Sequence, residues 1–360
     1  MTFIFWQRTL DILHSSFLRN LAEIYSVVLV TEIGMDATRN KHGFYIPDFW
    51  KVKIIVAPNK EQIAKLSETE AVHIVSGVWS FKLSKQVLRH LVKKQKTIGI
   101  FSEPFNWMGI KGEMRIVKYW LFRLSCGSSI RFILVTGERG RWCYEKIRFP
   151  KSKIFDWAYF TETPAITIKQ DMLSTPKILF IGSIDKRKNI LTLVDICMKT
   201  GVIDNLTIIG VGPLEATLRK KIKGTQCKYL GRIPNKEVHQ IIADSDVLIL
   251  PSLYDGWGAV VNEALMCGIP VIASNNCGSS ILVQGERGRV FSIKNNDLKK
   301  VISDFVRELP YSVDKRENIR NWALQNISGE TAVKYFNEIM EHVFFITAQR
   351  PMAPWLSEEY

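Results

Sequence analysis

Short apolar runs rich in β-branched residues alternate with amphipathic stretches along the whole 360-residue chain. This alternation is typical of βαβ units, in which helices cover both faces of a parallel sheet. In the first half the pattern predicts strands at Phe3–Trp6, Tyr25–Thr31, Val52–Ala57, Ala71–Gly77, Thr97–Glu103, Arg131–Gly137 and Ile154–Tyr159. In the second half it predicts strands at Lys177–Gly182, Leu206–Gly210, Tyr229–Gly231, Asp246–Pro251, Pro270–Ser274 and Gly288–Phe291. Each half is therefore expected to form an open α/β sheet.

A polar segment at residues 160–176 contains two prolines and interrupts this alternation near the middle of the chain. Such a segment is typical of a linker. Because 360 residues exceed the usual ~100–200 residues of one domain, we expect two Rossmann-like domains, at 1–165 and 166–329. The last amphipathic stretch, Glu330–Phe345, adds no strand, and we expect residues 330–360 to pack back on the first domain.

The composition fits a globular protein, with 46% hydrophobic and 23% charged residues. No apolar run approaches the ~18–20 residues of a membrane span, and the opening TFIFW is too short for the core of a signal peptide. We therefore expect a cytoplasmic protein. The six cysteines form no CxxC pair, which favours reduced core thiols over disulfides or a metal site.

The net charge of +14 points to a polyanionic partner, either nucleic acid or an acidic membrane face. The charge is concentrated in the first half, where residues 1–165 hold 25 basic and 14 acidic side chains and residues 111–153 alone hold 11 and 3. No motif that reads nucleic-acid sequence accompanies this charge. An anionic membrane is therefore the favoured partner, and nucleic acid is not.

The basic region contains an amphipathic stretch, Lys111–Ser125, with Arg115, Lys118 and Arg123 toward the edges of an apolar face. That face is predicted to consist of Ile116, Val117, Trp120, Leu121 and Leu124. A basic helix with aromatic and aliphatic side chains suits the plane of an anionic membrane. An ordinary helix packed on the sheet, with its lysines in water, would show the same pattern.

The segment Pro251–Ser274, PSLYDGWGAVVNEALMCGIPVIAS, is the richest in candidate chemistry. A buried strand runs into a loop that contains Gly256 and Gly258 and leads directly into a helix, Ala259–Met266. Glycines before a helix allow backbone N–H groups to approach a phosphate closely, so this loop is a candidate diphosphate cradle. Asp255 and Glu263 lie eight residues apart and suit a ligand with hydroxyls at both ends, such as a nucleotide-sugar. The alternative is that Asp255 is a turn residue and Glu263 lies on a solvated helix face.

This segment resembles the signature of the family 4 retaining glycosyltransferases, which have the GT-B fold of two Rossmann-like domains facing a central cleft. The family signature has a Glu, a Gly-aromatic-Gly, a second Glu eight residues on, and then G-x-P-V-I-A-S. Similar motifs extend over Lys177–Phe291 and include KILFIGSIDKRKN, IIGVGPL, YLGRIP and HQIIADSDVLILPS. The resemblance assigns the second domain to the nucleotide-sugar donor and the first to the acceptor.

The resemblance also implies roles for individual residues of the donor domain. Glu263 would bind the ribose hydroxyls, Asp255 the hydroxyls of the donor sugar and Lys188 the diphosphate. The remaining implied donor contacts are the backbone amides of Gly256, Trp257 and Gly258, the turn of Gly182 and Ser183, and the backbone of Arg232 and Ile233 near the base. The alternative is that Lys188 is an ordinary surface lysine in a basic turn with Lys186 and Arg187.

Two positions depart from the family pattern. The family's Gly-Arg is Gly182-Ser183 here, and we expect Arg187 or Lys186 to replace the missing cation. The first Glu of the signature is Asp255, which keeps the charge with one methylene less. A Y-D-G-W-G version of the signature resembles a branch found among bacterial surface-polysaccharide enzymes.

In the first half the resemblance is weaker, and its candidates come from strand ends. Glu103 ends a predicted strand and is a candidate catalytic base or acceptor contact. His14 follows the first strand and is either a catalytic-site residue or simply the start of a helix. His42 is a weaker candidate, and His73, within an apolar strand, is expected to be a core histidine.

The sequence therefore predicts a retaining glycosyltransferase that uses a nucleoside-diphosphate sugar, with UDP favoured, and needs neither cofactor nor metal. The expected acceptor is a saccharide or lipid-linked saccharide in bacterial lipopolysaccharide, capsule or O-antigen synthesis, met on the inner face of the cytoplasmic membrane. Two alternatives stay open: a GT-B nucleotide-sugar epimerase, and a non-enzymatic basic protein that binds nucleic acid. A Rossmann dehydrogenase is disfavoured because no G-x-G-x-x-G follows a first strand.

Overall fold

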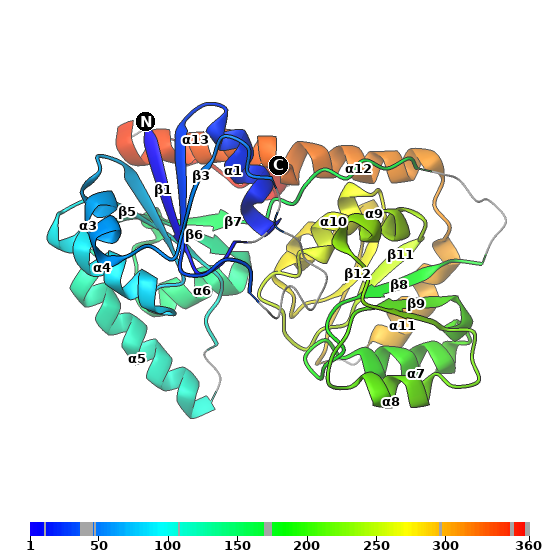
Figure 1. Cartoon of the computed structure of the whole chain (residues 1–360). Coiled ribbons are helices and arrows are strands. Elements are labelled where there is room, and N and C mark those ends of the chain that lie inside the picture. The colour runs from blue at the N-terminus through cyan, green and yellow to red at the C-terminus, as the bar shows by residue number, and fades with distance from the viewer. Residues whose placement is uncertain are drawn as a thin grey trace. The chain divides into compact units, whose positions relative to one another are not determined.

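The computed structural model describes residues 1–10, 12–36, 46, 48–106, 109–168, 175–294, 297–345 and 349–356. The candidate His42 lies outside these residues. The described residues form two compact units (Figure 1). The first unit comprises the described residues up to Phe160 together with those from Ser328 onward, and the second those between Thr161 and Ile327. The second unit thus begins within the polar proline-containing segment.

The first unit is built on a seven-stranded parallel sheet in the order β3-β2-β1-β4-β5-β6-β7. Its strands are β1 (Thr2–Gln7), β2 (Ser26–Thr31), β3 (Lys53–Val56), β4 (Val72–Ser76), β5 (Thr97–Ser102), β6 (Ile130–Thr136) and β7 (Ile154–Trp157). Its helices are α1 (Ser15–Ala22), α3 (Lys60–Glu68), α4 (Lys82–Lys93), α5 (Gly109–Cys126), α6 (Gly137–Lys146) and α13 (Gly329–Phe345). The central strands β1, β4, β5 and β6 are apolar along most of their length because both of their faces are covered.

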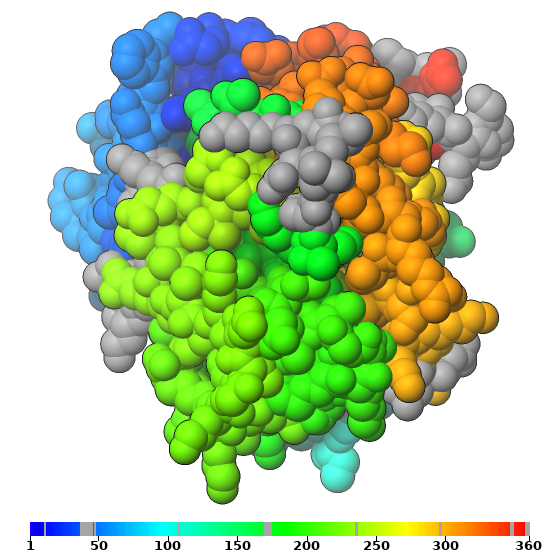
Figure 2. Space-filling model, turned by 90° about the vertical axis from the view of Figure 1, so that its right-hand side faces the viewer, coloured from blue at the N-terminus to red at the C-terminus, as the bar shows by residue number. Residues whose placement is uncertain are grey.

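The second unit contains a six-stranded parallel sheet in the order β10-β9-β8-β11-β12-β13. Its strands are β8 (Ile178–Ile181), β9 (Leu206–Ile209), β10 (Lys228–Gly231), β11 (Val247–Leu250), β12 (Val271–Ser274) and β13 (Gly288–Phe291). Its helices are α7 (Ile190–Thr200), α8 (Glu215–Lys221), α9 (Asn235–Ala243), α10 (Val260–Met266), α11 (Leu298–Phe305) and α12 (Val313–Ile327). Figure 2 shows one face of this unit, where the orange segment near its end lies beside the green segment that opens it, in agreement with the contact of α11 with α7.

Both units therefore have the Rossmann-like architecture that the alternating pattern predicts, and the two-domain α/β fold class is confirmed. Short 3-10 turns complete the connections, at Ile12–His14, Lys151–Lys153, Ile203–Asn205, Gly278–Leu282, Gly285–Arg287, Val306–Glu308 and Pro354–Leu356.

The C-terminal helix α13 packs against α1 within the first unit. Gly329 opens α13 at a point where a side chain does not fit: a Cβ there would lie 2.2 Å from Ser16 Oγ. About two turns further along α13, the Phe336 ring contacts the rings of Phe3 and Phe17 edge to face, with centroid distances of 5.2 and 5.3 Å. The last helix therefore completes the apolar covering of the first sheet.

His73 on β4 is fully buried, and the prediction of a core histidine is confirmed. The indole Nε1 of Trp6 donates a hydrogen bond to His73 Nδ1 at 3.2 Å, and His73 Nε2 lies 3.3 Å from the Thr69 carbonyl oxygen. Burial lowers the pKa of His73 to about 4, so the ring is neutral at physiological pH. The two contacts satisfy one neutral tautomer, in which Nε2 carries the proton.

All six cysteines are free, as expected for reduced thiols: Cys126 and Cys227 are half-buried, and the other four are buried. Within the described part of the chain, no group of three or more His, Cys, Asp or Glu side chains is arranged to hold a metal ion. None of the described helices combines the length and the apolar character needed to cross a membrane.

Candidate functional site

The loop between β11 and α10 is held in one conformation by contacts to the 3-10 turn at Gly278–Leu282. Ser279 Oγ donates a hydrogen bond to the Trp257 carbonyl oxygen at 2.6 Å, and the Ser279 amide donates to the same oxygen at 2.9 Å. The Trp257 indole is buried and donates to Asn262 Oδ1 at 2.8 Å. Gly258 has a φ of +91°, and a Cβ there would lie 2.9 Å from Leu250 Cδ2, so both conformation and space require glycine. Trp257 therefore serves as an internal anchor of the loop.

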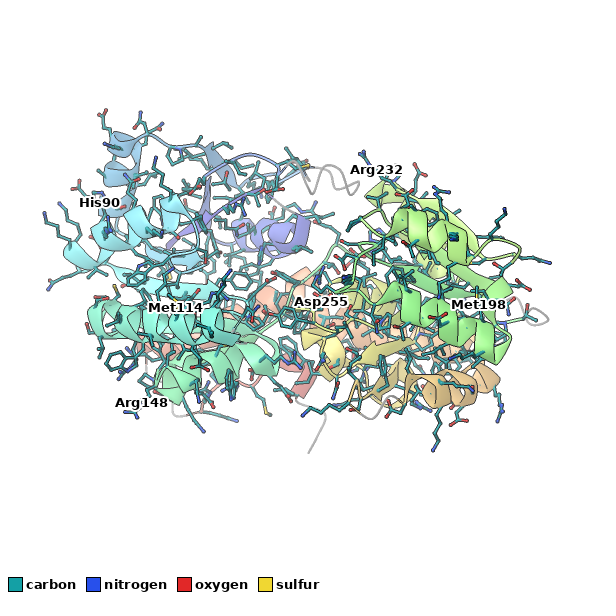
Figure 3. All side chains as sticks on the ribbon, turned by 90° about the horizontal axis from the view of Figure 1, so that it is seen from below. His90, Met114, Arg148, Met198, Arg232 and Asp255 are labelled. Carbon is teal, nitrogen blue, oxygen red and sulfur yellow. The ribbon has the colours of Figure 1, made fainter. Side chains whose placement is uncertain are left out.

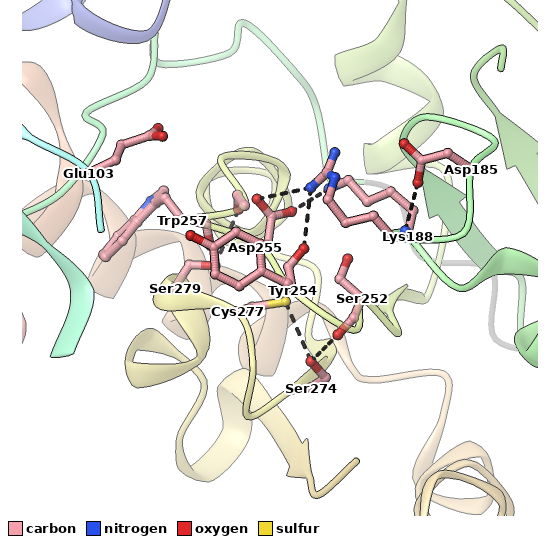
Figure 4. Close-up of polar contacts among 12 residues, drawn as sticks. Glu103, Asp185, Lys188, Ser252, Tyr254, Asp255, Trp257, Ser274, Cys277 and Ser279 are labelled. Carbon is pink, nitrogen blue, oxygen red and sulfur yellow. Dashed lines mark hydrogen bonds and ion pairs between the residues drawn. The ribbon is translucent and has the colours of Figure 1, made fainter. Parts of the chain in front are cut away.

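The backbone of Asp255 is held in place by two hydrogen bonds, independently of its carboxylate. Its amide donates to the Asn276 carbonyl at 3.1 Å, and its carbonyl accepts from the Gly278 amide at 3.2 Å. Its carboxylate forms an ion pair with Lys188 Nζ, and Arg187 Nη1 lies 3.7 Å from the other carboxylate oxygen (Figure 4). The side chains of Lys188 and Asp255 are only 11% and 13% exposed, so solvent screens this pair weakly.

Lys188 and Arg187 belong to the loop after β8, the strand that pairs with β11. This loop is tied to the loop after β11, because the Leu253 amide donates to the Arg187 carbonyl at 2.8 Å and Asn189 Nδ2 donates to the Pro251 carbonyl at 3.2 Å. Neighbouring parallel strands end at the same edge of a sheet, which is where open α/β sheets bind ligands. The two loops together place two cations and one carboxylate at that edge.

Of the two cations expected to replace the family arginine, Arg187 is the one that contacts the site: it lies against Asp255 and donates to the Tyr254 carbonyl at 3.3 Å. The aliphatic part of Lys188 packs against Gly182, where a Cβ would lie 3.4 Å from Cδ and from Cε. The amides of Gly256 and Gly258 donate to no acceptor within the described residues. Cations and unengaged amides at one sheet edge form an anion-binding arrangement.

Glu263 lies on α10 and is buried, with 9% of its surface exposed. The hypothesis of a solvated helix face is therefore wrong for this residue, because α10 packs against both α9 and α12. Burial raises the pKa of the Glu263 carboxyl to about 7. Among the described residues no donor or cation pairs with this carboxylate, which makes it a costly buried acid and a functional candidate.

The other predicted donor contacts follow further strands of the same sheet. Ser183 follows β8, and Arg232 and Ile233 follow β10, with Arg232 exposed (labelled in Figure 3). By the parallel topology these residues stand at the edge that also carries Asp255. Within the described part of the chain, no side-chain hydrogen bond or ion pair joins these residues to Asp255, Lys188 or Arg187.

In the first unit, Tyr159 contacts both Glu103 and His14, and the sequence analysis did not predict a role for Tyr159. The Tyr159 hydroxyl donates to Glu103 Oε1, and the Tyr159 ring meets the His14 ring edge to face at 5.2 Å. The His14 ring also meets Phe101 at 4.5 Å. His14 is the N-cap residue of α1, as the helix-start alternative proposed, but its ring does not cap the helix. Tyr159 ends a predicted strand, and that position at a strand end is the signal that would have found it.

A known protein family matches the half of the chain that contains Lys188, Asp255 and Glu263. The model of the family described as glycosyl transferases group 1 matches residues 175–356, which is half of the chain. The chain belongs to the glycosyl transferases group 1 family. The matched residues include the Lys188, Asp255 and Glu263 positions of the second unit.

Among curated relatives, this group 1 glycosyl transferase is 26% identical over 163 residues to an uncharacterized 41.2 kDa protein in the cps region of Klebsiella pneumoniae, covering 45% of each chain. It is 34% identical over 107 residues to the UDP-Gal:alpha-D-GlcNAc-diphosphoundecaprenol alpha-1,3-galactosyltransferase of Escherichia coli, covering 29% of this chain and 27% of that one. The chain thus matches less than half the length of these relatives.

Two solved structures share the fold of this group 1 glycosyl transferase over nearly its whole length. The lipopolysaccharide outer core galactosyltransferase WaaB superposes with a TM-score of 0.68 at 16% identity, covering 96% of this chain and 99% of that one. Anabaena HepE in complex with UDP superposes with a TM-score of 0.69 at 11% identity, covering 95% and 100%. At this identity the likeness shows the fold, which is that of GT-B glycosyltransferases.

Proposed function

We propose that this protein transfers a sugar, with retention of the anomeric configuration, from a nucleoside-diphosphate sugar to an acceptor hydroxyl. The observation that carries the proposal is the convergence of Lys188 and Arg187 on Asp255, beside the amides of Gly256 and Gly258. A diphosphate brings two negative charges and several acceptor oxygens, which this set of cations and amides complements. Asp255 then exchanges its contact with Lys188 for the hydroxyls of the donor sugar.

The reaction follows from where the charges lie. The bond between the anomeric carbon and the diphosphate oxygen breaks, and negative charge grows on the leaving diphosphate beside Lys188. The acceptor oxygen forms the new bond on the same face, and its proton passes to the departing diphosphate oxygen. Lys188 and Arg187 stabilise the charge that develops, which is the largest contribution such a site makes. No metal is required in this scheme.

The proposed donor is a UDP-sugar and the proposed acceptor a lipid-linked saccharide in lipopolysaccharide, O-antigen or capsule synthesis. HepE, which shares the fold, is described in complex with UDP. The E. coli relative carries UDP-Gal and a diphosphoundecaprenol acceptor in its name. Buried Glu263 supports the assignment, because an acid in a dry environment forms strong hydrogen bonds to ribose hydroxyls.

The decisive experiment is a thermal-shift panel of UDP-, GDP- and ADP-sugars followed by assay of nucleoside diphosphate release, with and without added EDTA. A ligand at 100 times its Kd stabilises the folded state by about 2.7 kcal/mol. We expect UDP-sugars to shift the unfolding temperature and to be turned over in the presence of EDTA. NMR of the product reports the anomeric configuration. If no nucleotide-sugar shifts the unfolding temperature, the donor assignment is wrong.

The exposed face of α5 supports docking on an anionic membrane. Its apolar side chains recur at helical spacing and are 82%, 68%, 55%, 50% and 57% exposed, respectively, at Ile110, Met114, Val117, Leu121 and Leu124. The N-terminal end of α5 projects from the unit in Figure 1, and the helix faces the viewer in Figure 3, where Met114 is labelled. Apolar side chains flanked by lysine and arginine suit a lipid headgroup region.

The structure corrects one part of the predicted membrane face. Ile116 is half-buried and packs on the core together with Tyr119 and Phe122, so it does not belong to the exposed face. Flotation with anionic and with neutral liposomes tests the docking. Leu121→Gln/Leu124→Gln should reduce the bound fraction about tenfold or more, and Ile24→Gln, a similarly exposed position elsewhere in the unit, should not. Equal binding of both variants, or of both kinds of liposome, would remove the membrane from the proposal.

A further inference from the structure

A pocket of about 600 Å³ lies between α4 and α5 of the first unit, and none of its lining residues belongs to either candidate site. The two helices run side by side in Figures 1 and 3, and Figure 3 labels His90 on α4 and Met114 on α5. The pocket is lined by Trp79, Lys85, Leu88, Arg89, Val92, Lys93, Lys118, Ser125 and Cys126. Its volume is within the range of small-molecule sites.

The pocket joins an apolar floor to a basic rim. Trp79, Leu88 and Val92 line the floor and belong to, or pack against, the core of the sheet. The rim carries the four cations Lys85, Arg89, Lys93 and Lys118. Among the described residues no carboxylate forms an ion pair with any of these four side chains, although two lysines just beyond α4, Lys94 and Lys96, are paired with glutamates.

Uncompensated like charges around an apolar floor are unfavourable without an anion. The amino group of Lys118 donates a hydrogen bond to the Trp79 carbonyl oxygen at 3.4 Å. Its pKa is lowered first by partial burial and then by the neighbouring charges of Lys85 and Arg115. An anion held between these side chains would relieve the repulsion that they exert on one another.

Trp79 adds a second observation, which is independent of charge. Its φ is 54°, a left-handed conformation that a bulky side chain adopts rarely and at an energetic cost. In this conformation its ring meets Phe122 of α5 edge to face at 5.2 Å and forms part of the pocket wall. In this conformation Trp79 presents an aromatic surface to the pocket.

We infer that the α4–α5 pocket binds one anionic glycerophospholipid, with an acyl chain on the floor of Trp79, Leu88 and Val92 and the phosphate among the basic side chains of the rim. The pocket opens beside the exposed apolar face of α5, so a lipid there anchors the unit in a defined register on the membrane. The inference extends the proposed membrane docking. The test below uses neither a membrane nor a glycosyl transfer assay. A failure of the lipid pocket can therefore be distinguished from a failure of the proposed membrane docking or of the proposed transferase activity.

The test uses dihexanoyl phosphatidylglycerol below its micelle concentration, with dihexanoyl phosphatidylcholine and inorganic phosphate as comparison ligands. Calorimetry measures binding, and mass spectrometry measures the rate at which a maleimide alkylates each half-buried cysteine. Cys126 lines the pocket, whereas Cys227 lies in the second unit and is the internal control. We expect one lipid per chain and at least fivefold slower alkylation of Cys126, with no change at Cys227.

Arg89→Gln/Lys93→Gln should weaken lipid binding about tenfold or more, since each basic side chain near an anionic headgroup contributes about 1 kcal/mol. The matched control Lys60→Gln/Lys65→Gln removes the same charge from α3 and should bind as the unchanged protein does. Four results would each overturn the inference: no lipid binding, protection of Cys126 by phosphatidylcholine, protection by phosphate alone, or lipid binding that leaves Cys126 unprotected.

Discussion

Glu263 allows the sharpest test of the donor site, because its burial gives stability a characteristic dependence on pH. Burial raises the pKa of this carboxyl from 4.5 to about 7. Below pH 4.5 the group is protonated in both the folded and the unfolded chain. Between pH 4.5 and 7 only the unfolded chain loses the proton, so the free energy of unfolding falls as pH rises and then levels off. The free energy of unfolding falls over this range because the folded chain binds more protons than the unfolded chain.

The magnitude follows from the shift of about 2.5 units, which corresponds to roughly 3 kcal/mol of lost stability above pH 7. Glu263→Gln removes the ionisation and keeps the shape. The variant also buries an amide, but that cost is the same at every pH. The stability advantage of Glu263→Gln over the unchanged protein should therefore grow by about 2.5 kcal/mol between pH 5 and pH 8.

Differential scanning calorimetry at the two pH values measures this advantage. For a unit of this size the growth corresponds to roughly 5–10 °C in the unfolding temperature of the second unit. The exposed Glu237→Gln on α9 is the matched control and should show no such growth. Contributions from His73 are common to all three proteins and cancel in the comparison. A difference between Glu263→Gln and the unchanged protein that stays constant with pH would refute the assignment of a desolvated carboxyl.

Three further predictions concern the reaction. Lys188→Ala and Glu263→Ala should each lose about 2–4 kcal/mol of transition-state stabilisation in assays of donor turnover, and near-normal kcat/KM in either would contradict their roles. Lys188→Met should lower the unfolding temperature because it leaves the Asp255 charge poorly solvated. Adding Asp255→Asn should restore the unfolding temperature but not donor turnover. Equal unfolding temperatures of the single and double variants would show that the Lys188–Asp255 pair does not affect stability. Tyr159→Phe should lower kcat with little change in the donor KM and add nothing to Glu103→Gln, whereas additive losses would mean that Tyr159 does not act through Glu103.

The fold could be predicted because it depends on signals that are local in the chain. Buried parallel strands are short apolar runs, and those runs predicted each of the thirteen strands in the described part of the chain to within a few residues. The donor loop was predictable for the same reason. Glycines, a strand and a helix in immediate succession specify its conformation, and the structure differs only by starting the helix at Val260 rather than Ala259.

The features of the site that the sequence did not predict depend on contacts between segments that lie far apart in the chain. The burial of Glu263 arises because α12, some fifty residues later, packs against α10. Tyr159 meets Glu103 only because β7 and β5 end at the same edge of the sheet. In α5, apolar residues occupy two faces of one helix, and periodicity cannot tell which face packs against the sheet; Ile116 was assigned to the wrong one.

The candidate donor site collects features that oppose stability. Glu263 is a buried acid that has no partner among the described residues, and Lys188 and Asp255 form a poorly solvated ion pair. Asn189 adopts a left-handed conformation with a φ of 57°. Features that lower the stability of the folded chain are expected at sites where a bound ligand compensates for them. In the proposed function, a diphosphate would bind the cations and ribose hydroxyls would bind the buried acid. One class of ligand would then account for both the cation cluster and Glu263.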